Sequence, residues 1–346
     1  MSNARSTDAP TRREFVTLMS SAAGFALVPN PIASLLRTQP NETAFRWEHL
    51  SNDVRVAYGS GGNSLAVIRG RDALLVDTKV SAFGQVLARE IGGFGATVRT
   101  VVNTHHHGDH SGGNDAFTSS AQVVAQARGK DRAVKSAEGS LARLKGASVD
   151  AYASGLRQSG FDVRITPEVR RDLEQFIAAL DRAKPEAVAP TETVDVEREI
   201  RAAGYTVQLK HVTPSHTDND LIVYLPELDL LHAGDLLFNG HHTFVDVSAG
   251  ASTRGWDQSL AAAIAMCKPT TRVVAGHGPV TDRAGLQRQR DYFDRLREAA
   301  NTAIKAGKTR AEVTALKPAA VANLEWPELL ADTLGVIHDE LTAKRS

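Results

Sequence analysis

The sequence predicts an α/β protein in which blocks of strands and helices alternate. Two blocks of short apolar runs flank a segment of helical composition, and a long amphipathic helix follows the second block. The 346 residues, 42% of them hydrophobic, provide ample core for one large domain or two modest ones. The order strands, helices, strands, helices is compatible with two stacked halves.

The first block begins at Arg46 and contains the apolar runs 54–58, 64–69 and 73–77, separated by turn residues. A helix is expected over about 82–91, and the apolar strand 97–103 follows it. The glycine-rich stretch 59–62 precedes a strand and not a helix. A dinucleotide-binding loop needs a helix at that point, so we exclude this type of site.

Residues 129–184 are rich in Ala, Arg, Lys, Glu and Leu and indicate a helical insertion between strands, without linker-like flanks. Thr166 and Pro167 suit the N-cap and first position of a helix. The apolar residues that fall on one face of this helix are Val169, Leu173, Phe176, Ile177 and Leu180.

The second block contains the apolar runs 205–212, 220–226, 228–233 and 271–275. A long amphipathic helix is expected after Asp282 and should stop at Gly307. We therefore expect a catalytic domain over 46–290 and a helical extension without recognisable chemistry over 291–346.

Charge and cysteine content exclude some classes of protein. Lys plus Arg and Asp plus Glu number 40 each, and this balance disfavours nucleic acid as a partner. The single cysteine, Cys267, permits neither an internal disulfide nor a thiolate metal cluster, and we expect it to be a small apolar residue on a helix. Any metal must therefore be held by imidazole and carboxylate, a donor set that suits Zn²⁺ and also Fe or Mn.

The N-terminus resembles a twin-arginine export signal. Arg12 and Arg13 directly precede a weakly apolar run over 16–28, too short to span a bilayer. We expect residues 1–33 to be removed as a signal peptide and the mature protein to be periplasmic or secreted. No later stretch is apolar enough for a membrane span, so no stable membrane insertion is expected.

The run "NTHHHGDHSGGN", from Asn103 to Asn114, is the sharpest chemical feature. His105, His107, Asp109 and His110 lie within six residues, just past the strand 97–103. Two imidazoles in an H-x-H pair can face one ion, while the D-H pair faces a neighbouring one. His216, Asp235 and His277 also follow apolar strands, and strand-end loops on one edge of a sheet converge in space.

These residues, in this order, resemble the metallo-β-lactamase superfamily over roughly residues 46–290. The resemblance implies a four-layer αββα sandwich, two mixed β-sheets flanked by helices. It implies a first metal on His105, His107 and His216, and a second on Asp109, His110 and His277, with Asp235 as the bridge. Asp77, in "LLVDT", would orient a ligand by hydrogen bonding, although an acid that only caps a turn is the alternative.

The site predicts metal-dependent hydrolysis. Two cations about 3.5–4 Å apart that share a water lower its pKa enough to give hydroxide at neutral pH. Such a hydroxide would attack a carbonyl or phosphoryl centre, and Asp109 is the nearest candidate to pass a proton. The best-known β-lactamase subclass has a cysteine in place of Asp235, whereas an aspartate there is typical of the glyoxalase II, lactonase and phosphodiesterase branches.

We expect a small, partly apolar substrate with a carbonyl-centred bond, such as a lactone, ester or β-lactam-like amide. Export would separate the enzyme from cytosolic glutathione thioesters, and the insertion, poor in aromatics, should form an apolar wall suited to acyl groups. The alternatives are a phosphodiesterase, an iron-dependent oxygen or sulfur oxidoreductase, or a metal-binding scaffold without catalysis.

The remaining histidines of this region are expected to be less important. His106 should point away from the ligands, and His211 and His232 should pack within strands or support ligands. His241 and His242 follow Asp235 closely, so they could line the mouth of the pocket or face water.

Overall fold

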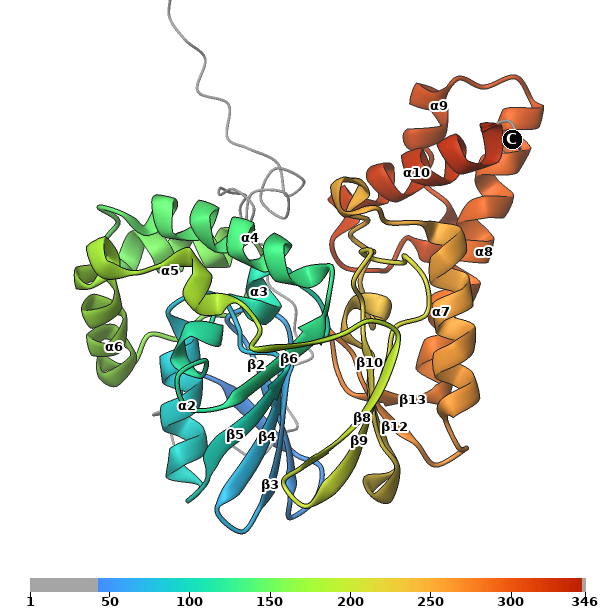
Figure 1. Ribbon diagram of the computed structural model, residues 1–346. Helices are drawn as coiled ribbons and strands as arrows, with labels where there is room; N and C mark the ends of the chain where they lie inside the picture. The colour runs from blue at the N-terminus through green and yellow to red at the C-terminus, as the bar shows by residue number, and fades with distance from the viewer. Residues whose placement is uncertain (1–42, 344–346) are drawn as a thin grey trace, which may run out of the picture.

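Two β-sheets lie face to face in the computed structural model, which describes residues 43–343 (Figure 1). The first sheet has its seven strands in chain order, and the second has the order β13-β12-β11-β10-β9-β8. The first sheet consists of β1 (Arg46–His49), β2 (Val54–Tyr58), β3 (Ser64–Arg69), β4 (Asp72–Val76), β5 (Thr97–Val102), β6 (Gln122–Gln126) and β7 (Glu192–Val194). The second consists of β8 (Glu197–Ala202), β9 (Tyr205–Lys210), β10 (Ile222–Leu225), β11 (Leu230–His232), β12 (Arg272–Val274) and β13 (Thr281–Asp282).

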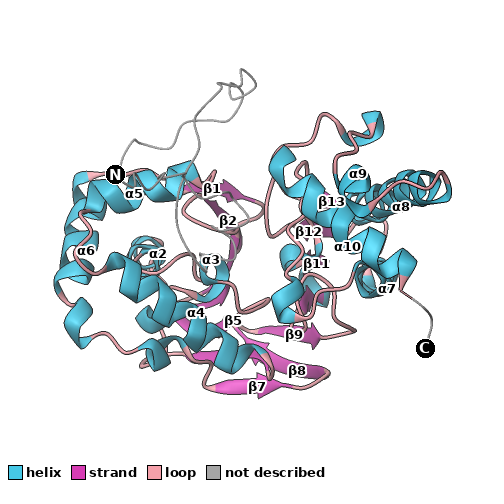
Figure 2. Cartoon of the chain, turned by 90° about the horizontal axis from the view of Figure 1, so that it is seen from above, coloured by secondary structure: helices cyan, strands magenta, loops and turns pink. Residues whose placement is uncertain are grey.

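Helices cover the outer face of each sheet, as the view from above shows (Figure 2). The helices on the side of the first sheet are α2 (Phe83–Gly93), α3 (Gly108–Ser111), α4 (Gly129–Leu144), α5 (Val149–Gln158) and α6 (Pro167–Ala178). Those on the side of the second sheet are α7 (Thr253–Met266), α8 (Arg283–Lys305), α9 (Arg310–Thr314) and α10 (Leu330–Thr342).

Three apolar layers hold these elements together. The layer between the sheets joins Val56 and Leu74 of the first sheet to Val223 and Val274 of the second. A second layer lies between the first sheet and α2, α5 and α6, and a third lies between the second sheet and α7, α8 and α10. Strands covered on both faces need apolar residues at consecutive positions, which explains the unbroken apolar runs of β4 and β10. The predicted α/β fold with two sheets flanked by helices is confirmed.

The strand directions place several loops at one edge of the molecule. Strands β4, β5, β6 and β7 are mutually parallel, so they end on the same side. Strands β9 and β11 both run antiparallel to β10, and β12 runs parallel to β11, so these three also share an end. All the predicted metal-facing residues lie in the loops that follow β5, β9, β11 and β12.

The insertion consists of α4, α5 and α6 between β6 and β7. Thr166 caps α6 through its side chain and Pro167 is the first helical residue, as predicted. The helix ends at Ala178, so Leu180 lies in a following 3₁₀ turn. Strands β6, β7 and β8 were not predicted; β7 has only three residues, and β8 carries four charged residues among its six.

Helix α8 begins after Asp282, which caps it, and Gly307 follows its end with a φ of 77°. Residue 290 lies inside this helix, so α8 continues across the boundary expected between domain and extension. Cys267 is the C-cap of α7 and is partly buried, just beyond the helix on which it was expected. The expected signal peptide lies outside the described residues, and no helix within 43–343 has the length and apolarity to cross a membrane.

Candidate metal centre

The loop after β5 turns directly into the short helix α3, whose N-cap is His107. This tight path directs the side chains of His105, His107, Asp109 and His110 toward the space between the two sheets' strand ends. Two glycines from other loops allow close packing on this side. A Cβ at Gly62 would lie 2.1 Å from the His110 ring, and one at Gly276 would lie 1.9 Å from Asp235 Oδ1. Any larger residue at either position would displace a metal-facing side chain.

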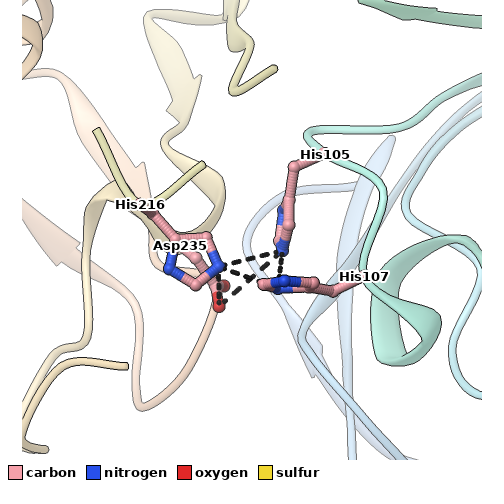
Figure 3. A group of neighbouring side chains, drawn as sticks. All are labelled: His105, His107, His216 and Asp235. Carbon is pink, nitrogen blue, oxygen red and sulfur yellow. Dashed lines mark hydrogen bonds and ion pairs between the residues drawn. The ribbon is translucent and has the colours of Figure 1, made fainter. Parts of the chain in front are cut away.

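His105, His107 and His216 form the first group of converging nitrogens (Figure 3). The Nε2 atom of His216 lies 3.2 Å from His105 Nε2 and 2.9 Å from His107 Nδ1, and these last two atoms are 3.0 Å apart. Three imidazole nitrogens this close together cannot all be satisfied by hydrogen bonds to one another. A cation at their centre would satisfy all three.

Asp109, His110 and His277 form the second group. The Oδ2 atom of Asp109 lies 3.4 Å from His110 Nε2 and 3.3 Å from His277 Nε2, and the two nitrogens are 3.4 Å apart. Both histidines present Nε2, and the aspartate supplies a negative charge that the first group lacks.

Asp235 lies between the two groups. Its Oδ1 atom is 3.1 Å from His110 Nε2, and its Oδ2 atom is 3.3 Å from His277 Nε2 and 3.4 Å from His216 Nε2. The structure therefore brings together all seven residues predicted from the sequence, in the two groups and with the shared carboxylate that the resemblance implied.

Asp77 sits behind the loop after β5 and holds two of its histidines. Its Oδ2 atom accepts from His110 Nδ1 at 2.7 Å and from Thr104 Oγ1 at 2.8 Å, and Thr104 Oγ1 lies 3.0 Å from His105 Nδ1. The backbone N–H of Thr104 also donates to Asp77 Oδ1. Fixing the Nδ1 side of His110 leaves its Nε2 atom directed into the site. This is the orienting position predicted for Asp77; the part played by Thr104 was not predicted.

Asp246 holds His107, and no sequence signal singled it out. Its Oδ2 atom lies 2.9 Å from His107 Nε2, so His107 presents Nδ1 to the first group, unlike its neighbours. His216 is oriented by the protein backbone, because its Nδ1 atom donates to Phe244 O at 2.8 Å. That tautomer leaves a lone pair on Nε2, as a metal ligand requires.

The electrostatics differ between the two groups. Burial lowers the pKa of His216 to about 4 and also holds the pKa of His105 well below its ordinary value, so both imidazoles are neutral. Burial alone would also lower the pKa of His110, but Asp235, Asp109 and Asp77 outweigh it and raise the value. Burial alone would raise the pKa of Asp235, but His277, His110 and His216 outweigh that effect and lower it. His105 and His216 are thus ready to bind a cation, whereas His110 must first lose its proton; deprotonated imidazoles with ionised carboxylates form a donor set that fits divalent metal ions.

Aromatic rings surround the histidines. Phe238 stacks on His277 with ring centroids 5.2 Å apart, and Phe161 stacks on it from the insertion at 6.3 Å. Trp326 lies 5.0 Å from His277, although it belongs to the C-terminal extension. The insertion, expected to be poor in aromatics, adds one ring to this cluster, and the extension, for which no chemistry was expected, adds another. Single aromatics scattered over the chain show no periodicity that could have revealed this cluster.

The other histidines have varied positions. His106 turns from both groups toward Asn219, and His211 donates to Asp220 O behind the site. His232 is buried at the end of β11, near Asn63 O. His241 lies against Trp326 with ring centroids 4.4 Å apart, at the rim of the site. His242 is buried and contacts Tyr292 of α8, so it does not line the rim.

Two sheets, strand-end loops and a shared His/Asp cluster define a metal-dependent hydrolase. The family model of the metallo-beta-lactamase superfamily matches residues 57–277, so the chain belongs to that superfamily. It is 24% identical over 260 residues to the Beta-lactamase-like protein 2 homolog of Caenorhabditis elegans, covering 74% of this chain and 68% of that protein. It is 28% identical over 142 residues to a linear primary-alkylsulfatase of Pseudomonas sp., covering 40% of this chain and 26% of that protein.

Solved structures of the same fold include DIM-1 metallo-beta-lactamase and a metallo-beta-lactamase from Pontibacter korlensis. The first is 17% identical with a TM-score of 0.51, covering 72% of this chain and 96% of its own. The second is 18% identical with a TM-score of 0.51, covering 71% of this chain and 97% of its own. At this identity the similarity establishes the fold, and the substrates of these proteins are not carried over.

Proposed function

We propose that this chain is a dinuclear zinc hydrolase that cleaves a carbonyl-centred bond in a small molecule. The position of Asp235 is the observation that supports two ions over one. Its two oxygens face His110 of one group and His216 of the other, at 3.1 and 3.4 Å. A carboxylate placed in this way suits two cations that share one ligand.

Each residue of the site has a distinct role in this proposal. His105, His107 and His216 would hold one ion, while Asp109, His110 and His277 would hold the other. The bound ions would supply an activated water and polarise the oxygen of the scissile group. Asp109 Oδ2 faces His110 and His277, and their charge holds its pKa well below its ordinary value against the effect of burial. It is therefore ionised, as a metal ligand must be, and its place beside the reacting atoms makes it the candidate to pass a proton.

The aromatic residues beside His277 favour a substrate with an apolar or flat group next to the scissile bond. Phe161 and Trp326 are partly exposed beside His277, and their rings suit such a group, whereas Phe238 supports His277 from the core. This wall supports esters and lactones of apolar acids. The match to an alkylsulfatase over 142 residues favours a second candidate, hydrolysis of a sulfate ester with an apolar alcohol.

Metal analysis and a substrate panel test the proposal. Purified protein should contain close to two zinc ions, and the zinc-loaded enzyme should hydrolyse lactones or aryl esters. The panel includes β-lactams, bis-aryl phosphodiesters and alkyl sulfates. Faster turnover of alkyl sulfates or phosphodiesters than of every acyl substrate would contradict the carbonyl-centred reaction, and one iron per chain would contradict the zinc centre.

We also propose that the protein is exported, on the basis of Arg12 and Arg13 and the apolar run that follows them. A reporter that works only outside the cytoplasm, fused to residues 1–40, should be active. Replacing both arginines by lysine should silence it, and activity that survives this change would contradict a twin-arginine route.

A further inference from the structure

A cavity of about 220 Å³ lies between the insertion and the metal loop. Its walls come from the end of α4, from α5, from the loop around Ser81 and from Gly108 at the start of α3. The lining residues are Val80, Ser81, Gly108, Ser140, Arg143, Leu144, Ala147, Ala151, Tyr152, Gly155 and Leu156. None of these side chains belongs to the metal-facing groups.

The cavity borders the metal centre through Gly108. This residue stands between His107 of the first group and Asp109 of the second, and it is part-exposed where its neighbours are buried. The cavity therefore touches the metal loop at the residue that lies between the two groups along the chain. A molecule whose reacting bond lies at the metals could extend an arm past Gly108 into this space.

The lining favours an apolar arm. Leu144, Leu156 and Val80 contribute aliphatic surface. The polar lining groups bond to protein atoms: the Arg143 guanidinium donates to Ser140 Oγ, and the Tyr152 hydroxyl donates to Ser81 O at 2.7 Å. Filling the cavity with apolar atoms would therefore leave these bonds in place.

We propose that this cavity binds an unbranched apolar chain of the substrate, so that the enzyme prefers amphiphilic esters with an acyl chain of intermediate length. The inference rests on the proposed acyl hydrolysis. The volume is consistent with it, because an apolar cavity of about 150 Å³ already accepts benzene. Each buried methylene group can contribute up to about fourfold in affinity.

A series of 4-nitrophenyl esters from acetate to octanoate tests the preference on zinc-loaded enzyme. The value of kcat/KM should rise with chain length and then level off once the cavity is full. Ala151→Phe should abolish the rise and leave the acetate ester unaffected, because only the longer chains reach α5. Ser154→Phe is the matched control, since Ser154 is exposed on the same helix and does not line the cavity.

A second variant distinguishes a filled cavity from misfolding of Ala151→Phe. A Cβ at Gly155 would meet no heavy atom within 4 Å, so Gly155→Leu adds volume without a backbone clash. It should reproduce the effect of Ala151→Phe. Calorimetric titration with octanoate and acetate provides a readout independent of turnover: octanoate should bind at least about tenfold more tightly, and filling the cavity should remove that difference.

The outcomes separate the two proposals. Ester hydrolysis without any dependence on chain length overturns the cavity assignment and leaves the acyl hydrolase standing. If no ester is hydrolysed, the acyl reaction fails, and the titration still decides the cavity. Equal octanoate affinity in wild type, Ala151→Phe and Ser154→Phe would overturn the assignment of the cavity as the site of the apolar chain.

Discussion

The two sheets contribute to the metal centre in different ways. The first sheet supplies His105, His107, Asp109 and His110 from one loop after β5. The second supplies three residues from three loops: His216 after β9, Asp235 after β11 and His277 after β12. One half of the site is thus a local sequence feature, and the other half exists only through the assembly of a sheet.

The two halves are also held differently. Asp77 supports the first half by hydrogen bonds to His110 and, through Thr104, to His105. In the second half His216 is held by a backbone carbonyl, and His277 is held by stacking on Phe238. We infer that the first half depends on one buried side-chain carboxylate, whereas the second depends on a backbone hydrogen bond and on packing. The following substitutions test that difference, from the largest expected effect to the smallest.

Asp235→Ala should have the largest effect, because among residues 43–343 no other carboxylate is recorded against histidines of both groups in this way. We expect a loss of activity of more than about 100-fold and retention of close to one metal ion per chain. Metal content after dialysis, measured by mass spectrometry, checks this. Two tightly held ions in the variant would show that Asp235 is not a bridge.

His216→Ala removes a nitrogen of the first group and should cost about 100-fold in activity. His211→Ala is the matched control, because His211 is also a buried histidine after β9 but bonds to Asp220 O. Both variants should be compared by activity and metal content at equal folding, judged by circular dichroism. A larger loss in His211→Ala would overturn the ligand assignment.

Asp77→Asn should reduce metal affinity by about 10–100-fold without removing any ligand atom. The amide of this variant has one oxygen, and its NH2 group cannot accept hydrogen bonds. The three bonds that Asp77 accepts from His110 Nδ1, Thr104 N and Thr104 Oγ1 therefore cannot all persist, and His110 loses its fixed orientation. A competitive chelator titration measures the change. An unaltered affinity would favour the simpler interpretation of Asp77 as a turn cap.

Metal affinity should increase with pH through both groups, because the pKa of His107 is raised as well as those of His110 and His277. The raised pKa values of His110 and His277 keep them protonated above the ordinary value of about 6.5, and a metal must displace those protons. Affinity should therefore rise with pH up to the raised pKa values and level off above them, with a slope of up to about tenfold per pH unit per proton. A flat profile in chelator titrations would show that the metal-free histidines are neutral.

The metal-free fold should show the opposite trend. A histidine with a raised pKa stabilises the folded state fully below about pH 6.5, and this contribution is lost as pH rises through the folded-state value. The melting temperature of the metal-free protein should accordingly decline over the range in which metal affinity rises.

Trp326→Leu should have the smallest effect, a few-fold increase in KM for aryl esters with kcat and metal content unchanged. The indole lies 5.0 Å from His277 but supplies no metal-facing atom. Steady-state kinetics with aryl and methyl esters of one acid separate its contribution. A matching fall in kcat would mean that Trp326 positions His277 and does not only contact substrate.

The sequence alone determined the parts that depend on local order. The apolar runs that form β4, β5, β10 and β11 predicted these strands, and the His and Asp residues a few positions beyond strand ends predicted the candidate ligands. The same reasoning failed for β8, because it begins with three consecutive charged residues, has no apolar run and lies at the edge of its sheet. Periodicity and composition describe residues that are close along the chain, so they predict secondary structure and local motifs.

Only the tertiary structure decided which distant residues complete the site. Asp246 reaches His107 across 139 positions, and Trp326 reaches His277 from beyond the family match. The backbone of Trp326 has a φ of 61°, a left-handed conformation that bulky residues seldom adopt and that the sequence does not predict. Such contacts produce no periodic pattern in the sequence, because they join loop residues that are distant along the chain and become neighbours only when the chain folds.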